Sequence, residues 1–295
     1  MTAASGTVTR PRARRRGGAA LLVLPAALWY LAFLIGPLIV LFVMSLGERS
    51  PNGGYAPGFT LEQYTNLTTR ITPLTNTLGL AFLNTIICVL VAFPVAYVLA
   101  LKVRGGWKLA LVALVVVPFW TSFLIRTYAW MTLLGNQGVP RLLSGLGFGD
   151  IQLLNTPFAV SLGIVYNYLP LMVLPIYVSL ERLDRSFLEA SRDLGAGPIS
   201  TLRQIVLPLA APGILSGIVL VFIPVMGEYL IPILLGGGKT YFLGNALADL
   251  FLQSRNWPFG SALAAVFVAG MIVIVAVYLA VSNRLVRGGR EASLI

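Results

Sequence analysis

The sequence contains no histidine and only one cysteine, Cys88. A disulfide within the chain is therefore impossible, and the usual zinc and copper ligand sets, which draw on histidine and cysteine, are out of reach. We expect no metal site, no cofactor and no redox role. Charged residues are also scarce, at 11% of the chain, whereas soluble domains carry roughly 25%. This scarcity excludes an ordinary soluble domain.

Apolar residues take the place of the missing charges, at 57% of the chain with a mean hydropathy of +0.86. A helix needs about 20 apolar residues to cross a bilayer. Six apolar runs reach this length, and they cover residues 19–46, 78–101, 109–134, 158–180, 213–235 and 259–283. We therefore predict an all-α membrane protein with six transmembrane helices in one integral domain, residues 19–283.

The first apolar run is the longest. It contains 28 residues, which form about 42 Å of helix at roughly 1.5 Å per residue and exceed the hydrocarbon thickness. We expect this helix to tilt, or to bend at Pro25 and Pro37. It is also too long for the apolar region of a cleaved signal peptide, so we expect it to be retained.

Lysine and arginine are distributed unevenly between the two sides that six spans create. If the N-terminus is cytoplasmic, the inner segments hold fifteen of the 21 basic residues and the outer segments hold five. The positive-inside rule then predicts that both termini lie in the cytoplasm, with the spans in the bacterial plasma membrane. The basic segment 1–18 cannot bury apolar area and is predicted to be a disordered cytoplasmic tail, and 284–295 a second tail. The net charge of +11 indicates attraction to anionic lipid rather than to nucleic acid.

The most informative polar segment is the predicted cytoplasmic loop 181–212. Ser186 is followed three residues later by Glu189, which is the spacing of a capping box and predicts that a helix begins there. Gly195 supplies the left-handed residue that ends this helix.

A second short helix is predicted to follow in the same loop. Pro198 suits its first position, where the missing N–H costs nothing, and Pro208 is predicted to close it after Ile205. Each helix presents one face suited to docking in a groove; the residues on these faces are Leu188, Ser191 and Leu194 in the first helix and Ile199, Leu202 and Ile205 in the second. From these residues alone, the alternative is an ordinary connecting hairpin.

The same loop also matches a known motif. The matching residues are Glu189, Ala190 and Ser191, then Gly195 after three residues, then Ile205, Val206, Leu207 and Pro208 after nine more. They resemble the EAA loop of ABC importer permeases, E-A-A-x3-G-x9-I-x-L-P, with Ser191 in place of the second alanine. The resemblance implies that this loop is the coupling helix, which inserts into a cleft on a cytoplasmic ATPase.

Three further segments narrow the resemblance, namely 118–135 (PFWTSFLIRTYAWMTLLG), 227–238 (GEYLIPILLGGG) and 256–262 (NWPFGSA). They resemble permeases of spermidine/putrescine importers of the PotB/PotH type, although Asn256 stands where several relatives have aspartate. The similarity extends from about residue 20 to residue 287 and implies the type I ABC importer permease fold with a polyamine substrate. Ferric iron, phosphonate, thiamine and opine permeases look broadly similar, so these substrates stay open.

The resemblance also implies partners. They are cytoplasmic ATP-binding ABC subunits, a second permease subunit in a heterodimer, and an extracytoplasmic substrate-binding protein, in addition to membrane lipid. ATP hydrolysis is expected on another polypeptide. Residues 236–240 (GGGKT) resemble the end of a phosphate-binding P-loop, but Ile233 stands where the first glycine is required, and an apolar helix rather than a strand precedes them.

Two other classes of membrane protein fit the sequence less well than an ABC permease does. A secondary transporter has inverted repeats with broken helices in matching positions, and the sequence contains no such halves. A membrane enzyme needs a convergent set of acid, base, nucleophile or metal ligands, and the absence of histidine together with a single intramembrane carboxylate argues against it.

That carboxylate belongs to Glu228, the only acid well inside a predicted span. Pro224 and Pro232 on either side of it loosen the backbone, which favours a lined cavity over a lipid-facing surface. We expect Glu228 and Tyr229 to border the substrate pathway, where a carboxylate attracts a polyamine. The structural alternative is that Glu228 bonds Tyr229 or a neighbouring helix, or pairs with Arg126.

Other intramembrane residues have structural interpretations. Gly213 and Gly217 form a G-x-x-x-G pair, which allows close helix contact and could serve a dimer. For Asn84 and Asn167 we expect interhelical hydrogen bonds, and for Arg126 we expect snorkelling to the outer headgroups.

Overall fold

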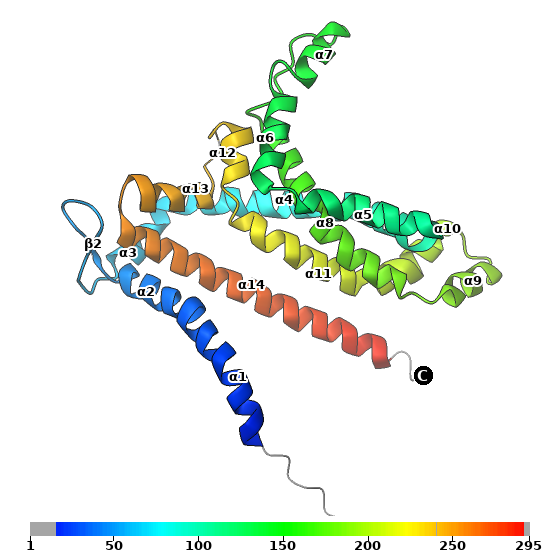
Figure 1. The fold of residues 1–295 in the computed structure, drawn as a ribbon, viewed down its shortest axis with the longest axis horizontal. Coiled ribbons are helices and arrows are strands. Elements are labelled where there is room, and N and C mark those ends of the chain that lie inside the picture. Colours follow the sequence, from blue (N-terminus) through cyan, green and yellow to red (C-terminus); the bar gives the residue numbers. More distant parts are fainter. Residues whose placement is uncertain (1–15, 240, 292–295) are drawn as a thin grey trace, which may run out of the picture.

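The computed structural model describes residues 16–239 and 241–291, and these are mostly helical. Figure 1 shows long helices lying side by side in an elongated bundle. Within these residues, five helical stretches are long and apolar enough to cross a membrane, and they are Val23–Ser45, Thr72–Lys102, Pro157–Glu181, Pro198–Met226 and Trp257–Ala280. Each of these stretches overlaps one of the six predicted spans.

Several of these stretches combine α-helix with a wider π-helical turn. The elements are α1 (Arg16–Tyr30), η1 (Leu31–Ile35) and α2 (Gly36–Ser45); α4 (Ile71–Tyr97) and η3 (Val98–Lys102); α8 (Pro157–Glu181); α10 (Pro198–Thr201), η4 (Leu202–Val206) and α11 (Leu207–Met226); and α14 (Trp257–Glu291). Shorter elements connect them, namely the strands β1 (Glu48–Arg49) and β2 (Tyr55–Ala56), and α3 (Glu62–Thr65), η2 (Asn66–Arg70), α7 (Val139–Gly145), α9 (Arg185–Asp193), α13 (Leu243–Ala248) and η5 (Asp249–Gln253).

The first span bends at one of its two prolines. Pro25 lies inside an uninterrupted α1, whereas the π turn η1 directly precedes Pro37 in the first turn of α2. A proline removes a backbone donor, so a local change of helical pitch beside it is expected. Figure 1 shows the helix changing direction between α1 and α2.

The prediction of a single helix over 109–134 is wrong. The segments Gly106–Trp120 (α5) and Phe123–Gly145, which begins with α6 (Phe123–Leu134), meet at 95°. Thr121 and Ser122 are extended between them, and Thr121 Oγ1 donates to the Pro118 carbonyl oxygen at 2.7 Å. Hydropathy did not reveal the bend because the sequence stays apolar on both sides of it.

Two other predicted boundaries also change. The span predicted over 213–235 stops at Met226, and α12 (Leu230–Gly236) begins as a separate helix after a break, since Pro224 and Gly227 are both poor helix formers. In contrast, α14 continues to Glu291, so residues 284–291 of the predicted C-terminal tail are helical. Residues 1–15 and 292–295 of the two predicted tails lie outside the described residues.

The core lies where α4, α8 and α11 pack against one another. The buried residues of α4 include Ala81, Cys88, Ala92 and Ala96, and their small side chains allow the neighbouring helices to approach closely. The first span differs, because 0% of its most apolar window is buried. Its side chains are therefore left for contact with lipid or with another chain.

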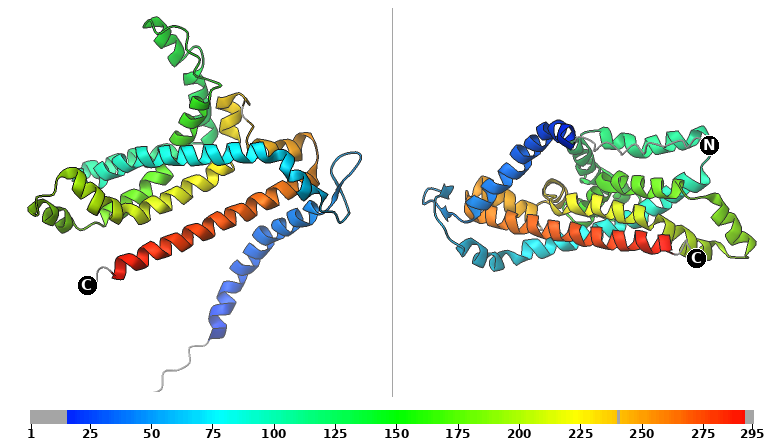
Figure 2. Two further views of the ribbon diagram at one scale, coloured as in Figure 1. Left: turned by 180° about the vertical axis from the view of Figure 1, so that it is seen from behind. Right: turned by 90° about the horizontal axis from the view of Figure 1, so that it is seen from below.

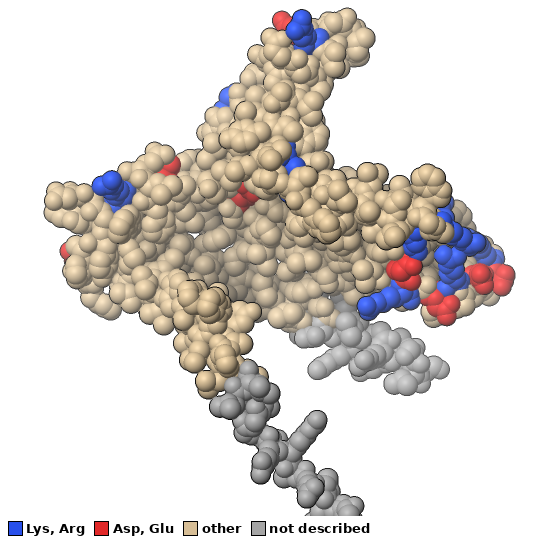
Figure 3. Space-filling view, in the orientation of Figure 1, with Lys and Arg blue, Asp and Glu red and all other residues tan. Residues whose placement is uncertain are grey.

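The two ends of the bundle differ in composition. The short helices α9 and α10 lie at one end together with the C-terminal end of α14, and the β1–β2 hairpin and α13 lie at the other (Figures 1 and 2). Figure 3 shows charged side chains gathered at the α9–α10 end, while the middle of this face is nearly free of them. The loop and the end of α14 thus share a side, as the predicted topology requires; that this side is cytoplasmic stays a prediction.

Candidate coupling loop and substrate pathway

The first helix of the polar loop, α9, is capped by Asp184. The Asp184 Oδ1 atom accepts a hydrogen bond from the Ser186 backbone N–H at 3.0 Å. This hydrogen bond stabilises the charged carboxylate and lowers the pKa of Asp184 below its ordinary value. The predicted Ser186–Glu189 capping box is therefore wrong, since α9 already begins at Arg185. Glu189 is exposed, and its carboxylate accepts no hydrogen bond within 16–239 and 241–291.

The end of α9 has the predicted conformation. Gly195 has a φ of +77°, and the Ala196 N–H donates to the Ser191 carbonyl oxygen at 3.0 Å. A left-handed glycine followed by such a hydrogen bond is a common way for a helix to end. A Cβ atom at Gly195 would meet nothing within 4 Å, so the backbone conformation rather than packing explains the glycine.

A hydroxyl pair joins the two short helices. Ser191 Oγ lies 2.8 Å from Thr201 Oγ1, and Ser191 is 6% exposed. Serine thus makes a partly buried contact between α9 and α10 that alanine at the same position could not make. The departure from the EAA pattern therefore has a structural role within the loop.

Three large apolar side chains project from the loop. Phe187 is 54% exposed, Leu194 88% and Ile199 67%, and we call these three residues the apolar knob. Leu188 and Leu202 instead pack against the core, so the two predicted docking faces are only partly exposed. Large apolar side chains left exposed on one short loop are suited to contact with a protein partner.

The sequence predicted that Pro208 closes the second short helix, but the helix continues past it. The π turn η4 joins α10 to α11, and within it the Leu207 N–H bonds the Leu202 carbonyl oxygen, five residues earlier. Pro208 then falls in the first turn of α11, where the wider π turn lets the helix accommodate the missing N–H. Along this stretch Ile205 is half-buried, whereas Leu207 and Pro208 are exposed.

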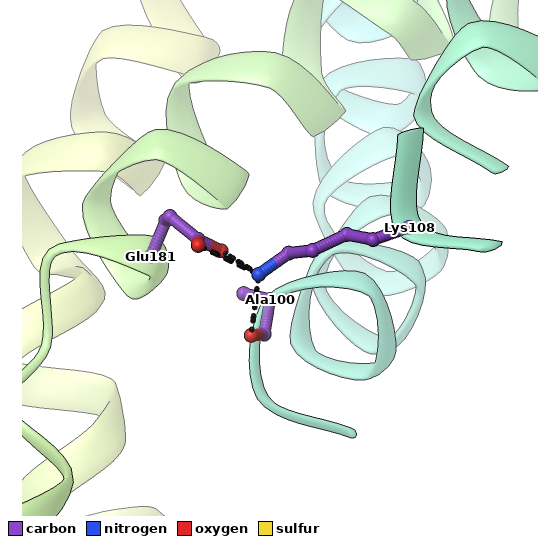
Figure 4. Close-up of polar contacts among 3 residues, drawn as sticks. All are labelled: Ala100, Lys108 and Glu181. Atoms are coloured by element: carbon purple, nitrogen blue, oxygen red, sulfur yellow. Dashed lines mark hydrogen bonds and ion pairs between the residues drawn. The ribbon is translucent and has the colours of Figure 1, made fainter. Parts of the chain in front are cut away.

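An ion pair braces the base of the loop (Figure 4). Lys108 Nζ lies 2.5 Å from Glu181 Oε2 and donates to the Ala100 carbonyl oxygen at 3.3 Å. The ammonium also lies 5.9 Å from the centroid of the Tyr177 ring. These contacts connect the last residue of α8 with η3 and the first turn of α5.

Glu228 lies in the break between α11 and α12 rather than well inside a span. Its Oε2 accepts from the Tyr168 hydroxyl at 2.6 Å, and its Oε1 accepts from the backbone N–H groups of Leu230 at 3.0 Å and Ile231 at 3.2 Å. Glu228 is 7% exposed. Of the structural alternatives, the bond to a neighbouring helix is present, because Tyr168 belongs to α8. The described residues include no ion pair between Glu228 and Arg126.

Tyr229, the other predicted pathway residue, lies in the same break but is 40% exposed. Its carbonyl oxygen accepts from Asn245 Nδ2 at 3.4 Å, which connects the break to α13. The structure thus brings Glu228 and Tyr229 together while burying the acid and leaving the tyrosine partly accessible. A pathway role for the pair stays a prediction.

The close contact that Gly213 and Gly217 allow is within the chain. A Cβ atom at Gly213 would lie 2.5 Å from the Pro175 carbonyl oxygen, and one at Gly217 would lie 2.5 Å from Met172 Sδ. Both neighbours belong to α8. The G-x-x-x-G pair therefore packs α11 against α8, and this use leaves no need for a dimer to explain it.

The remaining polar residues of the spans are bonded differently from the predictions. Arg126 does not snorkel, because it is 8% exposed and its guanidinium carbon lies 5.6 Å from the centroid of the Phe119 ring. Asn84 and Asn167 each donate to the backbone carbonyl four residues earlier in their own helix. These two hydrogen bonds are thus local and do not join helices.

Sequence reasoning missed three of these features. Asp184 carried a usable signal, because aspartate is as good an N-cap as serine and stands two residues before Ser186. Tyr168 and the Lys108–Glu181 pair carried none, because their partners are far away in the sequence and no local spacing relates them.

The sequence is similar to a known protein family and to named members of it. Residues 19–288 match the family described as "Binding-protein-dependent transport system inner membrane component". The chain is 38% identical over 255 residues to the spermidine/putrescine transport system permease protein PotB of Haemophilus influenzae, covering 85% of this chain and 89% of that protein. It is 37% identical over 254 residues to PotB of Escherichia coli, covering 84% of this chain and 92% of that protein.

Solved structures share the fold. A chain of a bacterial ABC transporter involved in the import of the acidic polysaccharide alginate aligns with a TM-score of 0.73 at 20% identity, covering 90% of this chain and 95% of that one. A chain of the MetNI methionine ABC transporter in an inward-facing conformation aligns with a TM-score of 0.53 at 18% identity, covering 74% and 94%. Taken with the family match over residues 19–288, these similarities establish that the chain belongs to the binding-protein-dependent transport system inner membrane components, the multi-pass permease subunits of ABC transporters.

Proposed function

We propose that this chain is the permease of an ATP-driven importer for polyamines of the spermidine and putrescine class. The observation that carries the proposal is the 38% identity, over 85% of the chain, to a permease named for spermidine/putrescine transport. The second relative with this name extends the similarity over 92% of its own length. Similarity over nearly the whole transmembrane region includes the helices that border a pathway.

The partners we propose are a cytoplasmic ATPase, a second permease subunit and an extracytoplasmic substrate-binding protein. ATP is hydrolysed on the ATPase, and the permease contributes the path. The first span supports a second transmembrane partner, because none of its most apolar window is buried within the chain. The solved alginate transporter was captured in complex with a periplasmic protein bound to an alginate pentasaccharide, which is the kind of assembly proposed here.

The loop α9–α10 is the proposed contact with the ATPase. Its apolar knob of Phe187, Leu194 and Ile199 is exposed, and Glu189 and Ala190 are exposed beside it. Because Glu189 has no capping role, its contribution is expected at the interface rather than within the loop. The Gly195 turn and the Ser191–Thr201 contact hold the knob in a fixed shape.

The break between α11 and α12 is the proposed border of the pathway. A break in a membrane helix exposes backbone polar groups, which are tolerated where the helix faces protein or a water-filled path. Tyr229 is the partly exposed side chain of this break, and an aromatic ring can contact a protonated amine through its face.

The proposal is tested by transport in a reconstituted complex. We expect the neighbouring genes to encode the ATPase, the second permease and the binding protein, and the four proteins are assembled in proteoliposomes. Labelled spermidine should accumulate only with ATP, and unlabelled putrescine or spermidine should compete, whereas thiamine, a phosphonate, an opine and ferric iron should not. Absence of ATP-dependent spermidine accumulation, or stronger competition by one of these other solutes than by putrescine, would overturn the substrate assignment.

A further inference from the structure

The two helices that leave the coupling loop are connected again away from the loop, where the break after α11 meets the middle of α8. On one side of the loop, the helical stretch Pro198–Met226 runs without interruption for 29 residues, or about 44 Å at roughly 1.5 Å per residue. It begins in α10, inside the loop, and ends at the break that contains Glu228. On the other side, α8 reaches the loop at Glu181 and carries Tyr168.

Between these ends, α8 and α11 are packed too closely to slide freely past each other. The glycine contacts described above leave no room for a Cβ atom at Gly213 or Gly217. Ser179 Oγ of α8 also donates to the Leu209 carbonyl oxygen of α11 at 3.1 Å. Because closely packed interfaces have discrete arrangements rather than continuous ones, a displacement of the loop should move the pair as one unit.

At the far end, Glu228 connects this pair to α12. One carboxylate oxygen bonds Tyr168 of α8, and the other bonds two backbone N–H groups in the first turn of α12. With three donors from its own chain and 7% exposure, the carboxylate is held by protein groups and is little accessible to a substrate ammonium.

We propose that Glu228 and Tyr168 form a latch that ties α12 to the α8–α11 pair, so that a movement of the coupling loop is transmitted to the outer part of the permease. Both are positioning residues: Glu228 borders the pathway without holding the substrate. The inference rests on the proposed ATP-driven function, but its first test does not depend on which solute is transported.

The first test follows α12 directly. In a Cys88→Ala background, Ile233→Cys places a single thiol on the exposed side of α12, where Ile233 is 44% exposed. In the assembled complex, the rate of labelling by a water-soluble maleimide should change when ATP and vanadate are added. Tyr168→Phe should abolish this change, because it removes the hydroxyl that bonds Glu228.

Tyr166→Phe is the matched control. Tyr166 lies one half-turn earlier on α8, its ring meets Trp130 edge-on at 5.3 Å, and its hydroxyl makes no hydrogen bond in the part of the chain that the structure describes. The change in labelling should persist in this variant. An equal response to ATP in both tyrosine variants, or no response in the parent, would overturn the latch.

The second test separates a latch from a substrate-binding acid. Glu228→Gln keeps a carbonyl oxygen for the α12 N–H groups and a polar partner for Tyr168, so it should retain more of Vmax than Glu228→Ala and should not raise KM. Glu228→Ala and Tyr168→Phe should lower Vmax of uptake by about tenfold, equivalent to about 1.4 kcal/mol, with KM and ATPase activity retained. If Glu228→Gln instead raises KM for spermidine while Tyr168→Phe is silent, the acid binds substrate and the latch is refuted. Absence of spermidine uptake in the parent complex would refute the proposed substrate and leave the labelling result to decide the latch.

Discussion

At the coupling-loop end of the α8–α11 pair, Leu194 and Ile199 are 88% and 67% exposed, whereas at the other end Glu228 is 7% exposed. The loop satisfies its polar groups with short-range hydrogen bonds and leaves apolar side chains in the open. The break does the opposite, because it buries a carboxylate and holds it with donors from two other helical segments. The difference indicates that one end is shaped to meet another protein and the other end to hold the chain itself together.

The largest expected effect is at the loop. Gly195→Val forces a β-branched residue into the φ of +77°, which costs about 1–2 kcal/mol and redirects the knob. We expect ATP-driven uptake to be lost while membrane insertion is normal, as measured by transport and by protein level in the membrane fraction. Gly197→Val is the control, since Gly197 has an ordinary φ of −71°. Equal loss in both variants would mean that the turn conformation is not what matters.

The packing of α11 against α8, between the two ends, is tested by adding side-chain atoms at a glycine. Gly213→Val places new atoms against the Pro175 carbonyl oxygen and Ser179 Cβ, 2.5 Å and 2.6 Å from the Cβ position, so we expect a destabilisation of about 1–3 kcal/mol. The measurement is the thermal unfolding midpoint of the complex in detergent. Gly79→Val is the matched control in α4, where a Cβ atom meets nothing within 4 Å. A midpoint unchanged by Gly213→Val would show that the helices separate easily.

A smaller, local effect is expected at the start of α9. Asp184→Ala removes the side-chain acceptor of the Ser186 N–H, so the protection of this amide from hydrogen exchange should fall, whereas Ser186→Ala should retain it. Because the pKa of Asp184 is lowered in the folded state, the cap is complete above the ordinary aspartate pKa and is lost only as pH falls through the lowered value. Protection that changes between pH 6 and 8 would contradict Asp184 as the cap.

The smallest effect is expected for the ion pair at the base of the loop. Lys108 and Glu181 have side chains that are 21% and 42% exposed, and exposed pairs contribute about 0–1 kcal/mol. Lys108→Met and Glu181→Gln should each shift the unfolding midpoint only slightly, with a small coupling in the double mutant. A coupling energy well above this range would mean that the pair holds the loop more firmly than its exposure suggests.

The sequence predicted the class of fold well because hydropathy records contact with lipid directly. It located the spans, the Gly195 turn and the helix beginning at Pro198, each of which depends on neighbouring residues. It failed at the 95° bend after α5 and at the early end of α11, because an apolar sequence reads the same whether or not the helix is broken.

The candidate site shows the same difference between features that depend on neighbouring residues and features that depend on distant ones. The coupling loop is nearly all local, so its outline was predictable, although Asp184 displaced Ser186 as the cap. The Glu228 environment depends on Tyr168, sixty positions away, and no periodicity connects these residues. Pro208 was misread because proline more often ends a helix than follows a π turn.

A photo-crosslink from each end of the molecule tests the orientation and the coupling role of the loop most directly. A benzophenone amino acid is placed at Leu194 in the loop, or at Leu252 in η5 near the opposite end, which are 88% and 76% exposed. In the assembled complex, illumination should join the ATPase to the chain from position 194 and not from position 252. An ATPase adduct from position 252, or none from position 194 in a complex that still contains the ATPase, would contradict both the orientation and the coupling role of the loop.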